Sequence, residues 1–339
     1  MNMKHLKKAA AVSLAALAAA GMIAGCGGEK KAETPKPAAT QPAAQTVKIN
    51  FPTAGASGAL YAVGAAITNM WNNNVPGVQA ASQASAGGIA NLNMVSDGEA
   101  QVSIAISSNV YQCFNGMDSF KDHPYKDLKV IAGLYMNPNQ VVVTAKSGIQ
   151  TLADVKGKHF AVASAGSSVY NESNAHFTAA GLKFPDDIQA EYITFTDAAD
   201  MLQNGSIDGA WIMSGAPASA VTQALTGGAR LVDIDDQLVE KLKAKYPWYA
   251  SYTIKAGTYP NQDRDVRTTA VKMVMFTRGD MPEDVVYNLT KAFWEHIDEL
   301  GQAQKNLKGL KPEDAVKDIA GVPLHPGAER YYREIGVLK

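Results

Sequence analysis

The chain has 339 residues, which is enough for two domains with a substantial core, and its 31 lysine and arginine residues nearly balance its 32 aspartate and glutamate residues. A formal net charge of −1 argues against nucleic acid as a partner, because that function calls for a basic face. Without the three lysines of the N-terminal segment described next, the chain has four more acidic than basic residues.

The N-terminal segment has the order of charge, apolar residues and small residues that is typical of a secretory signal. Lys4, Lys7 and Lys8 precede an apolar run over residues 9–23, which ends in Ala24-Gly25-Cys26. This ending resembles the lipobox of bacterial lipoproteins, which implies that Cys26 receives the lipid and becomes the first residue of the mature chain. A retained membrane-spanning helix is the alternative, but spanning needs roughly 20 apolar residues and this run is shorter. We expect a signal peptide over residues 1–25.

Residues 26–46 are expected to form the lipidated cysteine and a disordered tether. The segment is rich in Pro, Ala, Lys, Thr and Gln and has no large apolar residue, so it cannot bury enough surface to offset the entropy of ordering. No later run is long and apolar enough for a second membrane segment. The folded part is therefore expected to be extracytoplasmic, soluble and lipid-anchored to a bacterial membrane.

From residue 47 onward, strand-like and helix-like runs alternate, which is typical of an α/β fold. The first set has strands at 47–51, 78–81 and 102–106 and helices at 59–71 and 89–96. The second set has strands at 130–134, 141–144, 159–163, 190–193 and 209–213 and helices at 169–180 and 198–204. The repetition predicts two similar lobes.

The sequence changes character after a helix at 218–225 and a strand at 230–232. Residues 246–249 and 257–265 read as loops, 269–276 as a new strand, and 280–283 as the start of a helix capped by Asp280. The late strand has no partner near it in sequence, so we place it beside 141–144. This placement predicts a discontinuous lobe 1 over residues 47–149 and 253–339, with lobe 2 over residues 150–252.

Catalytic signatures are scarce. The sequence has no G-x-S-x-G, G-x-x-x-x-G-K, G-x-G-x-x-G or H-E-x-x-H motif, and its six histidines are scattered. We therefore expect no enzyme activity, no metal and no cofactor. Cys113 is interpreted as a small buried residue in preference to a reactive thiol, and His325, before Pro326 and Gly327, as a turn residue in preference to a base.

Four loops of small residues, each between a strand and the next helix, are the recurrent feature. They cover residues 53–58, 85–88, 164–168 and 214–217. Ligands of open α/β lobes gather at the carboxyl ends of the strands, and free backbone N–H groups at helix starts suit an anion. Tight turns and helix caps are the alternative for any single loop. Together, two in each lobe, the four loops favour a shared binding cleft.

The loops contain no arginine, so their affinity for an anion must come from interactions that are weaker than an arginine–carboxylate pair. Exposed helix ends contribute about 0.3 to 1 kcal/mol each, and four of them fall short of the roughly 8 kcal/mol of micromolar binding. Hydroxyl and amide hydrogen bonds, strengthened when two lobes close over the ligand and exclude water, must supply the rest.

Several motifs together resemble the TAXI receptors, the solute-binding proteins of tripartite ATP-independent periplasmic (TRAP) transporters. The matching segments are residues 53–64, 85–92, 97–100, 205–210, 214–217, 245–247, 256–260 and 324–328. The resemblance covers nearly all of residues 47–336. It implies a two-lobed periplasmic-binding-protein-like fold with a ligand cleft between the lobes. It also implies a receptor that delivers a small organic anion to the membrane subunits of a TRAP permease. Because such a receptor must dock on the permease, we expect a monomer. Glutamate, glutamine and 2-oxoglutarate-like acids are the ligands implied.

The resemblance also assigns candidate ligand-binding residues by position. They are Thr53, Ser57, Tyr61, Ser85, Gly88, Ser107, Asn109, Ser164, Ser167, Ser168, Tyr170, Glu172, Ser214, Gly215 and Ala216. For each serine, a helix cap that does not contact ligand remains the alternative.

Two positions depart from the TAXI pattern. Asn109 stands where many relatives have Asp, and Val169-Tyr170 where they tend to have Thr-Glu. Neutral Asn109 and Tyr170 offer no carboxylate to a ligand ammonium, which predicts a dicarboxylate or keto acid. Glu172 leaves a glutamate-like ligand open, because a small shift in alignment restores a carboxylate to the site.

Other function classes remain as alternatives. A receptor that feeds an ATP-driven importer would share the lobes and the tether. An extracytoplasmic hydrolase would need a serine with a histidine base in reach, for which His159 and His176 are the histidines near the loops of the second lobe. A purely structural envelope lipoprotein gives no reason for polar loops at strand ends.

Overall fold

The computed structural model describes residues 46–54, 59–165 and 167–339. Residues Ala44–Lys339 form one compact unit, which contains the whole buried core reported below. The predicted signal peptide, Cys26, the tether as far as residue 45 and Ser57 lie outside the described residues. None of the described helices has both the length and the apolar composition needed to cross a membrane.

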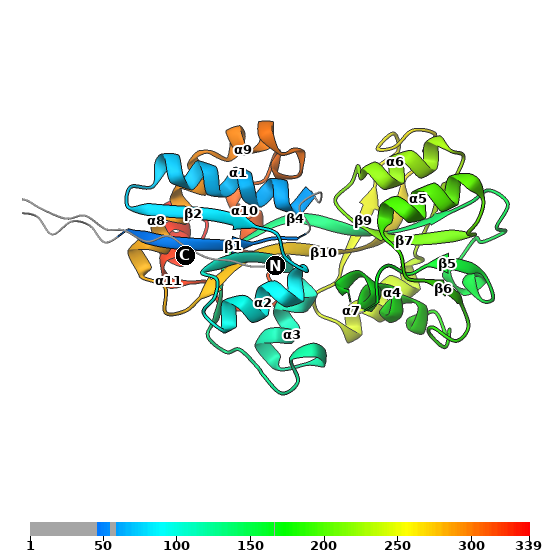
Figure 1. Ribbon diagram of the computed structural model, residues 1–339, viewed down its shortest axis with the longest axis horizontal. Helices are drawn as coiled ribbons and strands as arrows, with labels where there is room; N and C mark the ends of the chain where they lie inside the picture. The colour runs from blue at the N-terminus through cyan, green and yellow to red at the C-terminus, as the bar shows by residue number, and fades with distance from the viewer. Residues whose placement is uncertain (1–45, 55–58, 166) are drawn as a thin grey trace, which may run out of the picture. The chain divides into compact units, whose positions relative to one another are not determined.

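The first lobe is built from short strands, each followed by a helix. β1 (Val47–Pro52) and β2 (Val78–Gln83) pair in parallel and are joined by α1 (Ala59–Asn74). α2 (Gly88–Ser96) leads to β3 (Val102–Ile106), and α3 (Ser107–Asn115) follows β3 directly. In Figure 1, α1 lies on one side of these strands and α2 and α3 on the other. Phe51 and Trp71 meet edge to face in the core, so β1 and α1 are fixed to each other.

Two long strands connect the lobes. β4 (Leu128–Val143) pairs with β10 (Val266–Arg278) through residues 128–138 and with β7 and β8 through residues 139–143. β10 also pairs with β3 at one end and with β9 (Ala250–Ile254) at the other. Figure 1 shows β4 and β10 passing through both halves. The chain therefore crosses between the lobes more than once.

The predicted position of the late strand was wrong in one respect. Its partner on β4 is the segment 128–138, whereas residues 141–143 pair with β7 and β8. The strands predicted at 130–134 and 141–144 are parts of one 16-residue strand, which continues through Asn137-Pro138-Asn139. β4 changes its partners at Pro138, where the chain has no N–H to donate to a ladder.

The second lobe has a sheet covered by helices on both sides. β5 (His159–Ala161) lies between β6 (Gln189–Glu191) and β7 (Gly209–Met213) in parallel, and β8 (Arg230–Val232) adds to β4. Figure 1 shows α5 (Phe195–Asn204) and α6 (Ser219–Thr226) on one side and α4 (Ser168–Ala179) and α7 (Asp236–Lys245) on the other. The short 3₁₀ helix η2 (Leu152–Val155) precedes β5.

The C-terminal segment returns to the first lobe. It contains α8 (Glu283–Glu295), α9 (Ile297–Ala303), η3 (Lys305–Leu307), α10 (Pro312–Ala315) and α11 (Pro326–Glu334). Another 3₁₀ helix, η1 (Asp118–Phe120), follows α3. Asp280 does not cap α8 as predicted, because its carboxylate pairs with Arg278. His325 is a cap, since its Nδ1 accepts the N–H of Gly327 at 3.1 Å, and Cys113 is buried.

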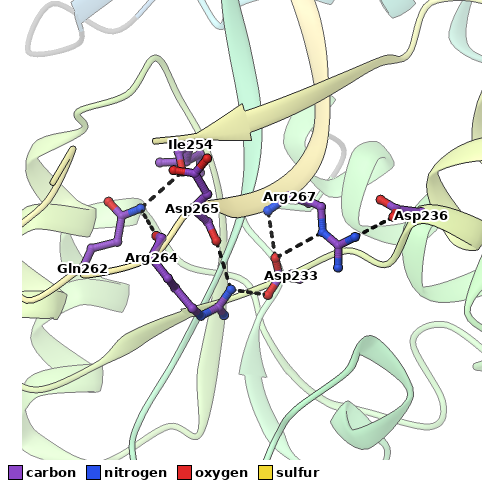
Figure 2. Close-up of polar contacts among 7 residues, drawn as sticks. All are labelled: Asp233, Asp236, Ile254, Gln262, Arg264, Asp265 and Arg267. Atoms are coloured by element: carbon purple, nitrogen blue, oxygen red, sulfur yellow. Dashed lines mark hydrogen bonds and ion pairs between the residues drawn. The ribbon is translucent and has the colours of Figure 1, made fainter. Parts of the chain in front are cut away.

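The loop between β9 and β10 is tied to the start of α7 by ion pairs (Figure 2). Asp233 accepts the backbone N–H of Arg267 at 2.8 Å and the Arg264 guanidinium at 2.5 Å, while Arg267 also pairs with Asp236. Gln262 donates to the carbonyls of Ile254 and Arg264 across the loop. Most of these side chains are largely exposed, so the network sets the loop geometry more than it adds stability.

Candidate functional site

The first turns of α3 and α4 meet where the lobes face each other. Ser167 is the N-cap of α4, and its hydroxyl accepts the N–H of Tyr170. Ser168, the next residue, donates to Asn109 Oδ1, and Ser108 donates to Glu172 Oε1 at 3.0 Å. We call Ser108, Asn109, Ser168 and Glu172 the seam. These contacts link one lobe to the other through side chains alone.

Residues 107–109 reach the seam as helix, although a strand end was expected. β3 ends at Ile106, which is also the N-cap residue of α3, so Ser107, Ser108 and Asn109 form the first helical turn. All three are buried. Ser107 accepts the backbone N–H of Lys272 at 3.2 Å, which fixes the start of α3 to β10.

The second loop approaches the seam, but its hydroxyl is used within the first lobe. A Cβ added at Gly88 would lie 3.2 Å from Asn109 Oδ1, so a side chain at this position would crowd the seam. Ser85 donates to Asn91 Oδ1 at 2.6 Å. Thr53 is fully buried and donates to the carbonyl of Gln83. Ser85 and Thr53 thus hold the loops of lobe 1 in place.

Three predicted residues lie apart from the seam. Tyr170 packs against Phe184 and Tyr192, with ring centroids 5.2 and 6.0 Å away. Tyr61 is partly buried on α1, and Ser164 is exposed. Of the residues at which this chain departs from the TAXI pattern, only Asn109 is therefore at the seam.

Glu172 is the buried carboxyl group of the seam. Burial raises its pKa from 4.5 to about 7, and hydrogen bonds from Tyr249, Ser108 and Asn139 partly oppose that rise. One turn later on α4, burial lowers the pKa of His176 from 6.5 to about 4. Near neutral pH Glu172 therefore changes its charge easily, whereas His176 stays neutral.

A chain of buried hydrogen bonds runs from the seam into the crossing strands. Trp211 donates to Asn139 Oδ1 at 3.1 Å, Asn139 donates to Thr269 Oγ1 at 3.0 Å, and Thr269 lies 2.7 Å from His176 Nε2. His176 Nδ1 lies 2.7 Å from the carbonyl of Glu172, which can only accept, so Nδ1 carries the proton and Nε2 accepts from Thr269. β4 and β10 thus supply polar side chains directly behind the seam.

A cavity of about 670 Å³ opens beside the seam between α3, α4 and the segment after α7. Its lining combines seam residues, amides, one further carboxylate and aromatic rings: Ser108, Asn109, Gln112, Asp118, Ser119, Asn171, Glu172, Asn174, Ala175, Thr178, Tyr246, Trp248 and Tyr249. No lysine or arginine lines it. We call it the seam cavity, and its size suits a small solute.

Most residues of the seam cavity were missed by the sequence reasoning. Residues 171, 174, 175 and 178 follow the spacing of one helical face, which is a signal that the predicted helix at 169–180 already contained. Trp248 and Tyr249 are different, because only the folded chain brings the segment after α7 to α3. Tyr111 of α3 and Trp248 pack at a tilt, with ring centroids 5.1 Å apart.

The fourth loop faces another cavity. Gly215 and Ala216 line a space of about 510 Å³ together with Tyr135, Met136 and residues 305–318. A Cβ added at Gly215 would lie 3.0 Å from Asn306 Oδ1, so this loop closely approaches η3. The carbonyl of Ser214 accepts from Gln140 at 3.0 Å. Of the predicted site residues, Asn109 and Glu172 thus line the seam cavity, whereas Gly215 and Ala216 line this one.

The two histidines considered as hydrolase bases have other partners. His159 Nε2 lies 2.5 Å from Glu191 Oε1, and both ring nitrogens of His176 are engaged by Thr269 and the Glu172 carbonyl. Among the described residues, no group of three or more histidine, cysteine, aspartate or glutamate side chains could hold a metal ion.

A family model described as the NMT1-like family matches residues 51–336. The chain belongs to the NMT1-like family. This NMT1-like protein is similar to the structure of MatC from Rhodopseudomonas palustris with bound malate, with a TM-score of 0.53 and 14% identity over 86% of this chain and 99% of that chain. It is also similar to XAC2383 from Xanthomonas citri bound to ATP, with a TM-score of 0.50 and 12% identity over 86% of this chain and 96% of that chain. The periplasmic aliphatic sulphonate binding protein SsuA from Escherichia coli matches at a TM-score of 0.46 and 17% identity, over 79% of this chain and 80% of that chain.

The likenesses to MatC and XAC2383 show the fold of the NMT1-like protein. It is the predicted two-lobed α/β fold of periplasmic binding proteins. At identities this low, the bound malate and ATP are properties of the other proteins.

Proposed function

We propose that this chain is an extracytoplasmic solute-binding receptor, tethered to the membrane through Cys26, which captures a small organic anion and delivers it to a TRAP permease. The seam carries the proposal: helix starts from both lobes meet there through Ser168–Asn109 and Ser108–Glu172, beside a cavity of about 670 Å³. Hydrogen bonds that span two lobes joined by crossing strands are suited to opening and closing over a solute. The occupied histidines favour a receptor over a hydrolase.

The charge of Glu172 distinguishes two classes of ligand. A ligand with an ammonium group would pair with the ionised carboxylate. Its affinity would therefore increase with pH, by up to about tenfold per pH unit, until the pH reaches the Glu172 pKa of about 7. A dicarboxylate or keto acid would instead favour the neutral form, so its affinity would be constant at pH values below the Glu172 pKa of about 7 and would fall as pH rises above it. We propose the second class, because Asn109 at the seam is neutral.

Calorimetry with residues 44–339 tests the proposal, since this unit contains the complete core. The protein is unfolded and refolded to remove any carried ligand, then titrated with 2-oxoglutarate, L-glutamate and malate between pH 5.5 and 8. Malate is included because the similar structure of MatC holds it. Micromolar binding of 2-oxoglutarate or malate, stronger at low pH, supports the proposal. Binding of glutamate that strengthens with pH would instead assign an amino acid ligand and make Glu172 its ammonium partner.

The transporter class is tested separately from the ligand. We propose a TRAP permease because the motifs resemble TAXI receptors. A gene for a fused TRAP-type permease beside the gene of this chain, and capture of that permease by the liganded receptor, would support this assignment. A neighbouring ATPase and permease pair would assign the receptor to an ATP-driven importer.

A further inference from the structure

The cavity that faces the fourth loop carries an excess of positive charge. It is bounded by Tyr135 and Met136 of β4, by residues 305–318, by residues 215–217 and by residues 250–252. Its charged lining residues are Lys272, Lys305, Lys308, Lys317, Asp314 and Asp318. Four lysines against two aspartates leave a formal excess of two positive charges, in contrast to the seam cavity, which has only carboxylates.

Lys272 places an incompletely paired ammonium group in this cavity. Its side chain projects from β10 and the residue is 5% exposed. Nζ donates to the carbonyls of Asp314 at 2.7 Å and Lys317 at 2.8 Å, which uses two of its three N–H groups. The ion pairs of the described residues do not include Lys272, whereas Lys317 pairs with Asp314. Burial also lowers the Lys272 pKa.

Asp318 and Asp314 favour the charged form of Lys272, but burial outweighs them and neither forms an ion pair with it, so an anion beside Nζ would offset the remaining cost. Lys305 and Lys308 are exposed and lie at the rim, where flexible lysine side chains can turn toward an anion. Neutral polar groups stand nearby, since Tyr135 and Asn306 both line the cavity. The volume of about 510 Å³ lies in the range of small-molecule sites.

We infer that this cavity, which we call the lysine cavity, is a second anion site that takes a small dicarboxylate. The two negative charges match the excess of two positive charges, with Lys272 at the inner end and Lys305 and Lys308 at the rim. An anion held there contacts residues of η3 on one side and residues 215–217 on the other, so it stabilises the arrangement in which these segments are close. The inference goes beyond the proposed function, because the seam can bind its solute while the lysine cavity is empty.

Chemical footprinting tests the site directly. Residues 44–339 are treated with an amine-acylating reagent with and without saturating succinate, and acylation of each lysine is followed by mass spectrometry. We expect succinate to slow acylation of Lys305 and Lys308 by about fivefold, because most of the sites are then occupied. The acylation rates of exposed Lys48 and Lys146, which serve as controls, should not change. The same protection is expected in Ser168→Ala, since the seam does not line this cavity. Equal acylation rates with and without succinate would overturn the inference, and protection by inorganic phosphate alone would overturn the dicarboxylate assignment.

A pair of charge-matched variants provides the affinity measurement. Lys305→Gln with Lys308→Gln removes the two exposed rim charges and leaves the core intact, whereas Lys48→Gln with Lys146→Gln removes equal charge elsewhere. We expect the first pair to weaken succinate binding about tenfold and the control pair by less than about twofold. Equal affinities for the two pairs would contradict the inference.

Discussion

Glu172 and His176 lie four residues apart on α4, and burial shifts their pKa values in opposite directions. The Glu172 pKa is raised from 4.5 to about 7, so between these values the folded protein holds a proton that the unfolded chain has lost. This group makes stability fall as pH rises through that window. His176, with its pKa lowered from 6.5 to about 4, makes stability rise as pH rises from about 4 to 6.5. The two effects largely cancel between about pH 4.5 and 6.5.

Replacing Glu172 with glutamine should expose the contribution of His176. Because a glutamine side chain cannot ionise, we expect the Glu172→Gln variant to gain stability from pH 4.5 to 6.5 while the native protein changes little. The difference in unfolding free energy between the two proteins should grow by up to about 3 kcal/mol from pH 4.5 to 7 and then stay constant. Urea unfolding at half-unit pH steps measures this difference. A difference independent of pH would mean that Glu172 titrates near its ordinary pKa.

The positions of residues 168, 170 and 172 show which part of the site could be foreseen. In a helix, residues four apart share a face and residues two apart do not, so Ser168 and Glu172 reach the seam together while Tyr170 packs with Phe184. That distinction follows from the predicted helix once its phase is considered. The contribution of Trp248 depends on how the segment after α7 folds back against α3, which no local pattern contains.

The helices and strands that could be predicted from the sequence are those with a strong apolar pattern. The strands at 102–106 and 209–213 are fully buried, and their continuous apolar or small residues gave a clear signal. No helix was predicted over α7, because half of the residues of Asp236–Lys245 are charged and only three are buried. The two strands predicted at 130–134 and 141–144 left residues 135–140 out of β4, because the partner that continues the sheet there is remote in sequence.

The close approach of α8 and α11 gives a prediction about helix packing. A Cβ added at Gly327 would lie 2.2 Å from the Glu283 carbonyl oxygen and 2.6 Å from the Tyr287 nitrogen, both of which are backbone atoms. Gly327→Ala should therefore push the helices apart and cost about 2 to 4 kcal/mol of unfolding free energy, measured by urea titration. Gly227→Ala is the control, since its Cβ would meet mainly the flexible Gln203 side chain and should cost under about 1 kcal/mol. Equal losses in the two variants would show that α8 and α11 can separate without strain.

At the scale of the whole molecule, the predicted anchor at Cys26 decides where the receptor works. If Cys26 is lipidated, full-length protein expressed in bacteria should incorporate a labelled fatty acid and sediment with membranes. Cys26→Ser should lose both properties, because the thiol that would receive the lipid is gone. Cys113→Ser is the matched control, since Cys113 is buried and should leave labelling unchanged. Label retained in Cys26→Ser would place the lipid elsewhere.

The seam links the two lobes, and this link should affect how tightly the ligand binds. The Ser168–Asn109 hydrogen bond joins the lobes, so it can form only when they are close, and ligand binding should depend on it if the ligand favours closure. Asn109→Ala and Ser168→Ala should each weaken binding of the identified solute several-fold. The double variant should lose about 0.5 to 1.5 kcal/mol less than the sum of the single losses. Calorimetry on the four proteins measures this coupling, with exposed Ser164→Ala as the control from the same loop. Strictly additive losses would mean that Asn109 and Ser168 act on the ligand independently, and that the bond between them does not hold the lobes together around it.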